Sequence, residues 1–240
     1  MQLKVFIKLD EPLTLPINYN SIIQGIIYHS CTKIDKEYTK ELHDYGINSD
    51  DTNKFKLFCF SNLYGTYKIE NKKITFSNSI FFEIRSIDPY FIHTVYEGMN
   101  KYGIKFGDRL VKPNLRLENK VIQETSIQIK MLSPIIAFKN NDENKKDYLS
   151  PMDNEFIPYL QNNFIRKYNT YYNDDPNEIN IEVIDVSHKD KCVTQFKNLY
   201  LTGWSGLYYI EGTPENLTFL YNVGLGSKNS QGFGLFDIDE

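Results

Sequence analysis

TPENLTFLYNVGLGSKNSQGFGLFDI, residues 213–238, contains the most glycine-dense part of the chain. Its beginning predicts a helix, because Thr213 is a favourable N-cap, Pro214 suits the first helical position and apolar residues then recur at helical spacing. Four glycines follow within residues 224–234, and GFGLFDI predicts a final strand. The stretch therefore predicts a glycine loop that connects a helix to the last strand.

This order argues against a nucleotide-cofactor loop. A dinucleotide-binding GxGxxG loop follows a strand and opens a helix, whereas this loop follows a helix. Asn229 also stands where the fingerprint requires glycine, and SKNS at 227–230 differs from the GK[ST] of a P-loop. Both cofactor interpretations are therefore disfavoured, and we expect no cofactor.

The four glycines still allow close backbone approach, so we expect N–H groups that point outward and hold an RNA backbone, with additional donors from residues 228–231. The alternative is a flexible turn, which the two flanking G-x-G pairs make less favourable. The expected RNA contacts of this loop are Gly224, Gly226, Lys228, Asn229, Ser230, Gly232 and Gly234.

The segments before this loop complete a six-element pattern. Ser150 and Pro151 predict the start of a helix, which Pro158 can kink. With the helix at 213–223 and the final strand, the order is β-α-β-β-α-β, that of the ferredoxin-like fold. The remaining predicted strands are 124–132, 179–187 and 199–211, with a polar loop at 140–147.

The first half fits the same order with one extra helix and additional strands. MQLKVFIKL alternates apolar and polar residues as a half-buried strand does. Asn20 or Ser21 is expected to cap a first helix, Asp35 a second that ends at Gly46, and Asp88 a third. The other predicted strands are 56–61, 72–77, 79–86, 104–106 and 109–117.

We therefore predict an α+β chain of two tandem ferredoxin-like (RRM-like) βαββαβ domains, residues 1–120 and 121–240. The 240 residues include 41% hydrophobic and 15% aromatic residues, enough for a substantial core. The chain shows no signal peptide and no membrane-spanning run, and its three cysteines lack CxxC spacing. We expect a cytoplasmic protein without membrane contact.

The formal net charge of −4 argues weakly against a nucleic-acid partner, but the charge is uneven. Residues 1–120 hold 17 basic and 14 acidic residues, a net of +3, and residues 121–240 hold 10 and 17, a net of −7. Within 101–116, Tyr102 and Phe106 lie among basic residues, which suits a single-stranded RNA path. An ordinary solvated edge strand explains this segment better when it is taken alone. The candidate RNA contacts here are Lys105, Arg109, Lys112 and Arg116.

Several motifs resemble one known family. GLGSKNSQGFG before a terminal strand resembles the C-terminal glycine-rich signature of the repeat-associated mysterious protein (RAMP) superfamily. LPINYNSIIQGIIYHS at 15–30, ELHDYG at 41–46 with KFKLFCFS at 54–61, and PMDNEFIPYLQNNFIRKY at 151–168 resemble segments of its CRISPR-associated endoribonucleases. The resemblance covers nearly the whole chain and implies cleavage of precursor CRISPR RNA within its repeats.

The resemblance implies cleavage without a metal, by attack of a ribose 2′-OH that leaves a 2′,3′-cyclic phosphate and a 5′-OH. Such chemistry needs a base, an acid and a cation near the phosphorane. His43 matches the Leu-His motif and is the candidate acid or base. Tyr28 matches the tyrosine that positions or activates the 2′-OH, and Lys56 matches the lysine that stabilises the phosphorane.

His29 and Lys54 are reserve catalytic candidates, because each lies beside or near a matched residue in sequence. The four histidines show no HxH or HExxH spacing, so we expect no metal site. We expect repeat RNA as the partner, and an effector complex and a homodimer remain open. The alternatives are a non-catalytic repeat-RNA-binding RAMP subunit of an effector complex and, less favoured, a nucleotide-binding enzyme.

Overall fold

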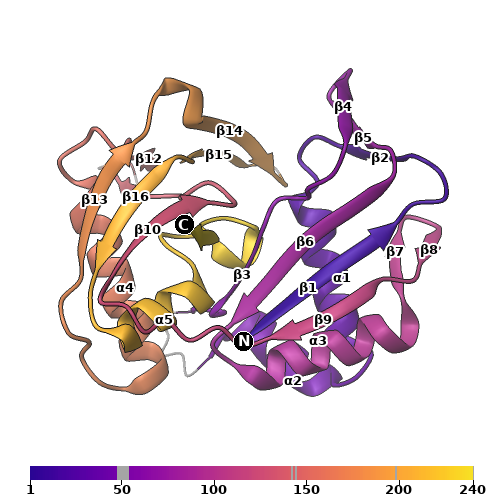
Figure 1. The fold of residues 1–240 in the computed structure, drawn as a ribbon, viewed down its shortest axis with the longest axis horizontal. Helices are drawn as coiled ribbons and strands as arrows, with labels where there is room; N and C mark the ends of the chain where they lie inside the picture. The colour runs from indigo at the N-terminus through magenta and orange to yellow at the C-terminus, as the bar shows by residue number, and fades with distance from the viewer. Residues whose placement is uncertain (48–53, 142, 144, 198, 240) are drawn as a thin grey trace.

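The computed structural model describes residues 1–47, 54–141, 143, 145–197 and 199–239. Two four-stranded antiparallel sheets lie side by side, one from each half of the chain, and helices cover one face of each sheet (Figure 1). Among the described residues, no helix is long and apolar enough to cross a membrane.

The first sheet has the strand order β3-β6-β1-β9, and every pairing is antiparallel. This strand order, with helices on one face of the sheet, is the arrangement of a ferredoxin-like unit. Gln2 pairs with Arg85 and Lys8 with Ser79, so β1 and β6 form the centre of the sheet. The elements are β1 (Gln2–Lys8), α1 (Asn20–Thr32), α2 (Lys36–Asp44), β3 (Phe58–Phe60), β6 (Ser79–Ser86), α3 (Pro89–Tyr102) and β9 (Asn114–Glu118).

The second sheet repeats this order as β13-β16-β10-β17, again antiparallel throughout. The predicted fold class is therefore confirmed: the chain is α+β, with two tandem ferredoxin-like units. The elements are β10 (Ser126–Met131), α4 (Phe156–Tyr172), β13 (Asn180–Asp185), β16 (Leu207–Glu211), α5 (Pro214–Val223) and β17 (Phe236–Ile238).

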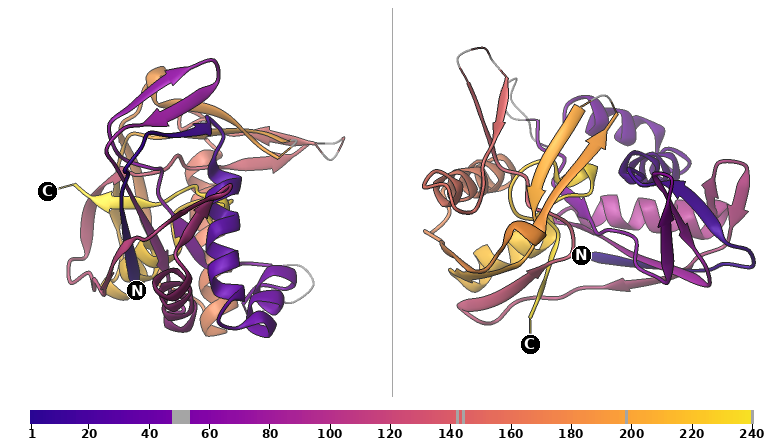
Figure 2. Two further views of the ribbon diagram at one scale, coloured as in Figure 1. Left: turned by 90° about the vertical axis from the view of Figure 1, so that its right-hand side faces the viewer. Right: turned by 90° about the horizontal axis from the view of Figure 1, so that it is seen from above.

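Short accessory strands surround the two sheets, and most of them were not predicted. The β11–β12 hairpin occupies the predicted polar loop, of which residues 142 and 144 lie outside the described residues, and it extends away from the body of the fold (Figure 2). The accessory strands are β2 (Leu13–Pro16), β4 (Tyr67–Glu70), β5 (Lys73–Phe76), β7 (Ile104–Phe106), β8 (Arg109–Val111), β11 (Phe138–Asn140), β12 (Lys146–Tyr148), β14 (Lys191–Phe196) and β15 (Leu199–Trp204).

Two predicted strands are each broken in the structure. The strand predicted at 199–211 divides at Ser205 into β15, which pairs with β14, and β16, which lies in the second sheet. The strand predicted at 109–117 divides near Pro113, because proline lacks the N–H that a strand ladder needs. Its first part pairs with β7, and its second part is the edge strand β9 of the first sheet.

The capping predictions for three helices are confirmed. The side chains of Asp35, Asp88 and Thr213 accept hydrogen bonds from backbone N–H groups in the first turns of α2, α3 and α5. The cap of α1 is Tyr19 instead of Asn20 or Ser21.

The predicted start of the fourth helix at Ser150 is wrong. Residues 151–155 form turns and a bend, and α4 begins only at Phe156. Pro158 consequently lies in the first turn of α4, where backbone N–H groups have no intrahelical partner, so a proline costs no helical hydrogen bond there.

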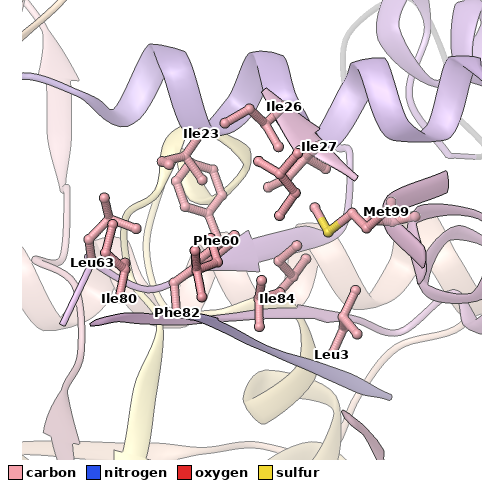
Figure 3. Packing of buried hydrophobic residues seen from close by; sticks show 14 of the residues in the cluster. Leu3, Ile23, Ile26, Ile27, Phe60, Leu63, Ile80, Phe82, Ile84 and Met99 are labelled. Atoms are coloured by element: carbon pink, nitrogen blue, oxygen red, sulfur yellow. The ribbon is translucent and has the colours of Figure 1, made fainter. Parts of the chain in front are cut away.

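In each half of the chain, the helices pack on the sheet and enclose a separate hydrophobic core. In the first half, Ile23 and Ile27 of α1 point toward Phe82 and Ile84 of β6 (Figure 3). The second half has a separate cluster, and Leu57 of the first half is buried in it. The segment just before β3 therefore joins the two halves, and this segment also carries Lys56.

Candidate active site

Tyr28 and His43 lie together at the ends of the first two helices. Tyr28 is in the last turn and a half of α1, and His43 is the second-last residue of α2. Their ring centroids are 5.3 Å apart and the rings meet edge to face, while Tyr28 also packs edge to face on Phe58 of β3. The two helices thus bring together a phenol and an imidazole that are 15 residues apart in sequence.

The imidazole of His43 is oriented by its neighbour in sequence. Nδ1 of His43 lies 2.9 Å from Oδ1 of Asp44, and this hydrogen bond lowers the pKa of the Asp44 carboxyl. An ionised carboxylate only accepts, so Nδ1 carries the hydrogen and Nε2 is left for a substrate. The His43 side chain is 65% exposed, which gives a substrate access to that atom.

The third residue near Tyr28 and His43 is Lys56, which lies two residues before the start of β3. Its ammonium donates to the carbonyl oxygen of Leu42 at 2.7 Å and to that of His43. Both carbonyls belong to the last turn of α2, where a cation is favoured by the helix dipole. The pKa of Lys56 is lowered overall, because partial burial outweighs the opposing effect of the Asp44 carboxylate.

Burial raises the pKa of Tyr28 well above its usual value. The phenol therefore stays protonated near neutral pH and acts as a hydrogen-bond donor or acceptor, not as a base. The structure brings Tyr28, His43 and Lys56 together at one place beside the C-terminal end of α2.

A cavity of about 260 Å³ opens next to this group, between the two halves of the molecule. Lys54, Lys56 and Phe58 line it from the first half, and Lys228 and Asn229 of the glycine loop line it from the second. The candidate catalytic group and the glycine loop, which are far apart in sequence, therefore share one cavity.

The two reserve residues lie differently. The Lys54 ammonium is 5.8 Å from the centroid of the Tyr45 ring, and Lys54 lines the same cavity as Lys56. His29 instead lines a separate hollow with Gly103 and Lys105, on the side of α1 that faces β7. The structure thus places Lys54 near the candidate group and His29 at a separate hollow.

The glycine loop is packed inside the molecule instead of standing free. Asn20 of α1 donates to the carbonyls of Gln231 and Gly232, and Gln24 donates to that of Ser230. The expectation of outward N–H groups is wrong for a large part of the loop, because the N–H groups of several residues bond to carbonyls within the protein. These residues are Gly224, Leu225, Ser227, Gln231, Gly232 and Gly234.

Replacing Gly234 with alanine is expected to destabilise the protein. Gly234 has φ +74°, and an added Cβ would overlap the carbonyl oxygen of Leu225. Gly107 has a similar φ of +62° and no atom within 4 Å of an added Cβ, so it is a matched control for the cost of positive φ alone. Urea unfolding should show Gly234→Ala to be about 1–3 kcal/mol less stable than Gly107→Ala. Equal losses would mean that the loop is not tightly packed.

The basic segment 101–116 is not one continuous ribbon. Phe106 is buried in the first core and is unavailable for base stacking, contrary to the expected alternation of basic and aromatic side chains. Arg109 donates to the carbonyls of Glu11 and Pro12, and Arg116 pairs with Glu118. Lys105 and Lys112 are exposed and stay candidates for RNA contact.

Sequence reasoning missed Asp44 and Lys167. Asp44 directly follows the candidate histidine, and this adjacency to an acid was the available signal. Lys167 is fully buried, lines the same cavity and donates to the carbonyls of Gly224 and Gly226. Nothing in the sequence distinguished Lys167 from an ordinary exposed lysine of an amphipathic helix. Across the described part of the chain, no three His, Cys, Asp or Glu side chains gather as a metal site would require.

Comparisons with known proteins agree with this arrangement. The family profile "CRISPR associated protein Cas6, C-terminal" matches residues 117–238. "CRISPR-associated endoribonuclease Cas6 1" of Methanocaldococcus jannaschii is 24% identical over 98% of this chain and 91% of its own length. "CRISPR-associated endoribonuclease Cas6" of Pyrococcus furiosus is 26% identical over 96% of this chain and 86% of its own length.

Two solved structures share the fold over all of this chain. One, described as a Cas6-related gene product from Pyrococcus furiosus, has a TM-score of 0.84 at 25% identity and is covered over 98% of its length. The other, described as a RAMP protein binding different RNA substrates, has a TM-score of 0.81 at 22% identity and is covered over its whole length.

Tandem ferredoxin-like units with a glycine loop before the last strand define the class of fold that this protein shares with the Cas6-related structure from Pyrococcus furiosus. The family profile covers half of the chain, so the class of fold can be narrowed to one protein family. The chain belongs to the CRISPR-associated Cas6 family.

Proposed function

We propose that this protein is a metal-independent endoribonuclease that cuts precursor CRISPR RNA within its repeats. The observation that carries the proposal is the meeting of Tyr28, His43 and Lys56 beside the cavity between the two halves. Membership of a family whose curated members are named endoribonucleases supports it. The RNA partner is proposed on the same grounds.

The proposed reaction is an internal transesterification. The 2′-hydroxyl oxygen attacks the neighbouring phosphorus while the bond to the 5′-oxygen breaks, leaving a 2′,3′-cyclic phosphate and a 5′-OH. The 2′-hydroxyl loses its proton to a water molecule, and the 5′-oxygen gains one from His43 in its imidazolium form, which carries a hydrogen on both ring nitrogens. His43 Nε2 serves as the general acid for the 5′-oxygen, because Nδ1 is already committed to Asp44.

Tyr28 and Lys56 have supporting roles in this proposal. The protonated Tyr28 hydroxyl positions the 2′-OH, since its raised pKa prevents it from acting as a base near neutral pH. The Lys56 ammonium has three N–H donors, of which two are used by the carbonyls at the end of α2. The third is left for a phosphorane oxygen, whose added negative charge it stabilises.

The same contacts of Lys56 favour a second candidate function. A lysine that caps α2 has a structural role, which a non-catalytic repeat-RNA-binding subunit of an effector complex would keep. In such a subunit the half-buried Tyr28 and the exposed His43 would take part in no reaction. We rank this second because a structural cap does not need an exposed imidazole oriented by Asp44.

Cleavage of labelled repeat RNA in EDTA tests the two functions. We expect the wild-type protein to cut the all-ribose RNA in EDTA and to leave RNA with a 2′-deoxy nucleotide at the cut intact. The reason is that the attacking oxygen is then missing while the binding surface is unchanged. Binding of both RNAs without cleavage of either would overturn the proposal in favour of the non-catalytic subunit, and cleavage of the 2′-deoxy RNA would exclude the internal attack.

A further inference from the structure

The cavity beside the candidate active site is lined by an unusual concentration of positive charge. Four of its lining residues are lysines, and among the described residues no aspartate or glutamate lines it. Lys54 and Lys56 come from the segment before β3, Lys167 from α4 and Lys228 from the glycine loop. Three separate parts of the chain thus direct lysines at one space.

Lys167 is the buried member of this set. Its side chain is almost fully buried, and its ammonium donates to the carbonyls of Gly224 at 2.8 Å and Gly226 at 2.7 Å. No carboxylate pairs with it among the described residues, and burial lowers its pKa to about 7. A buried ammonium without a counter-charge is costly to fold around, so an anion that approached this cavity wall would stabilise the charged form of Lys167.

Lys228 lies close to a fifth lysine. Lys228 has φ +63° in the glycine loop, and the charge of Lys146 on β12 adds to burial in lowering its pKa to about 8. The Lys146 ammonium itself lies 4.2 Å from the centroid of the Phe138 ring, and Phe138 lines the cavity. Like charges held this near one another repel unless a negative group lies between them.

The size and position of the cavity narrow the class of anion. Its volume of about 260 Å³ is below the ~300–1,000 Å³ of pockets for whole small-molecule ligands, and it suits a phosphate group with part of its sugar. Lys56 belongs both to the cavity and to the candidate catalytic group, so a ligand here lies next to the scissile phosphate.

We propose that this cavity binds one phosphate of the RNA that neighbours the scissile phosphate, with Lys228 and Lys146 as its contacts and Lys167 as a positioning residue. This inference rests on the proposed function. In this arrangement the glycine loop contributes its carbonyls, which hold Lys167, in place of the backbone N–H clamp expected from its sequence. The loop carbonyls hold Lys167, and Lys228 and Lys146 bind the RNA phosphate.

A chemical double-mutant cycle tests this site. The probe is repeat RNA with a 2′-deoxy nucleotide at the cut, which prevents the proposed reaction, and with one phosphate at a time replaced by a neutral methylphosphonate. For the wild-type protein we expect one linkage beside the cut at which neutralisation weakens binding about tenfold. For Lys228→Gln and for Lys146→Gln, binding of unmodified RNA should be weaker by a similar factor. Neutralising that linkage should then cost less than about twofold, because the contact is already lost.

Lys145→Gln is the matched control, because Lys145 lies beside Lys146 in sequence but is exposed and paired with Glu143 at 2.6 Å. It should keep the full effect of the neutral linkage. Equal effects of every methylphosphonate on the wild type, Lys228→Gln and Lys146→Gln would overturn the site, provided that thermal unfolding shows both variants to be folded. Because Lys146 is exposed on its hairpin, its variant keeps the test decisive if Lys228→Gln does not fold.

Two further arms separate the sources of failure. Inorganic phosphate that competes with RNA for the wild type, without any linkage-specific effect, would assign the cavity to free phosphate and overturn the RNA assignment. Cleavage of all-ribose RNA by the wild type is measured in parallel. Its absence would refute the proposed function, whereas cleavage without a linkage effect would refute only this site.

Discussion

Replacing His43 with alanine is expected to slow cleavage of repeat RNA by about 10²–10⁴-fold, measured as a single-turnover rate with the RNA bound. The variant removes the atom assigned to protonate the 5′-oxygen, since the raised pKa of the Tyr28 phenol makes it a poor proton donor and the third N–H of Lys56 is assigned to a phosphorane oxygen. RNA binding should change little, because His43 is exposed and carries no packing role beyond its contact with the Tyr28 ring.

Two other histidines give the controls. His93→Ala on α3 replaces an exposed imidazole away from the cavity and should cleave at the wild-type rate. His29→Ala examines the reserve residue, which lines a separate hollow with Lys105, and should also cleave nearly normally. A loss of less than about tenfold for His43→Ala would contradict its role as general acid, and a large loss for His29→Ala would move that role to His29.

Replacing Arg85 with alanine is expected to reduce the free energy of unfolding by about 3–5 kcal/mol. Arg85 is 1% exposed at the junction of the two halves, where it pairs with Glu83 and donates to the carbonyl of Phe236 at 2.6 Å. Its guanidinium also lies 3.6 Å from the centroid of the Tyr221 ring. Alanine removes these contacts and leaves the buried Glu83 carboxylate without its partner.

Urea unfolding measures this loss, and Arg116→Ala is its matched control. Arg116 also pairs with a glutamate on the first sheet, but its side chain is 72% exposed, so its removal should cost no more than about 1 kcal/mol. The double variant Arg85→Met with Glu83→Gln should be more stable than Arg85→Ala, because it removes the unpaired charge. If Arg85→Ala and Arg116→Ala lowered the free energy of unfolding by the same amount, the contacts of Arg85 between the two halves would not stabilise the fold.

The fold was predictable where local chemistry determines it. Asp35, Asp88 and Thr213 cap their helices as the sequence indicated, and the order of strands and helices gave the ferredoxin-like pattern. The break at Ser205 was not predictable, because residues on both sides of it have strand character and only pairing with two different sheets separates them. Tertiary pairing decides such boundaries.

The candidate site was predictable in part, and by resemblance more than by physics. Tyr28, His43 and Lys56 were placed from motifs. Their proximity follows from the short connection between α1 and α2 and from the hydrogen bonds of Lys56 to the end of α2. The buried state of the glycine loop was not predictable. Its glycines suggested an open backbone, whereas Gly232 is glycine because Phe60 and Asn20 of the other half occupy the space of a side chain.

The end groups of the cleaved RNA test the central claim most directly. In the proposed reaction the 2′-OH of the RNA is the nucleophile, and His43, Tyr28 and Lys56 form the catalytic group. Mass spectrometry of the 5′ fragment produced in EDTA should therefore show a 2′,3′-cyclic phosphate, and the 3′ fragment should begin with a 5′-OH. A 3′-OH on the 5′ fragment together with a 5′-phosphate on the other would contradict the account, because water would then be the nucleophile.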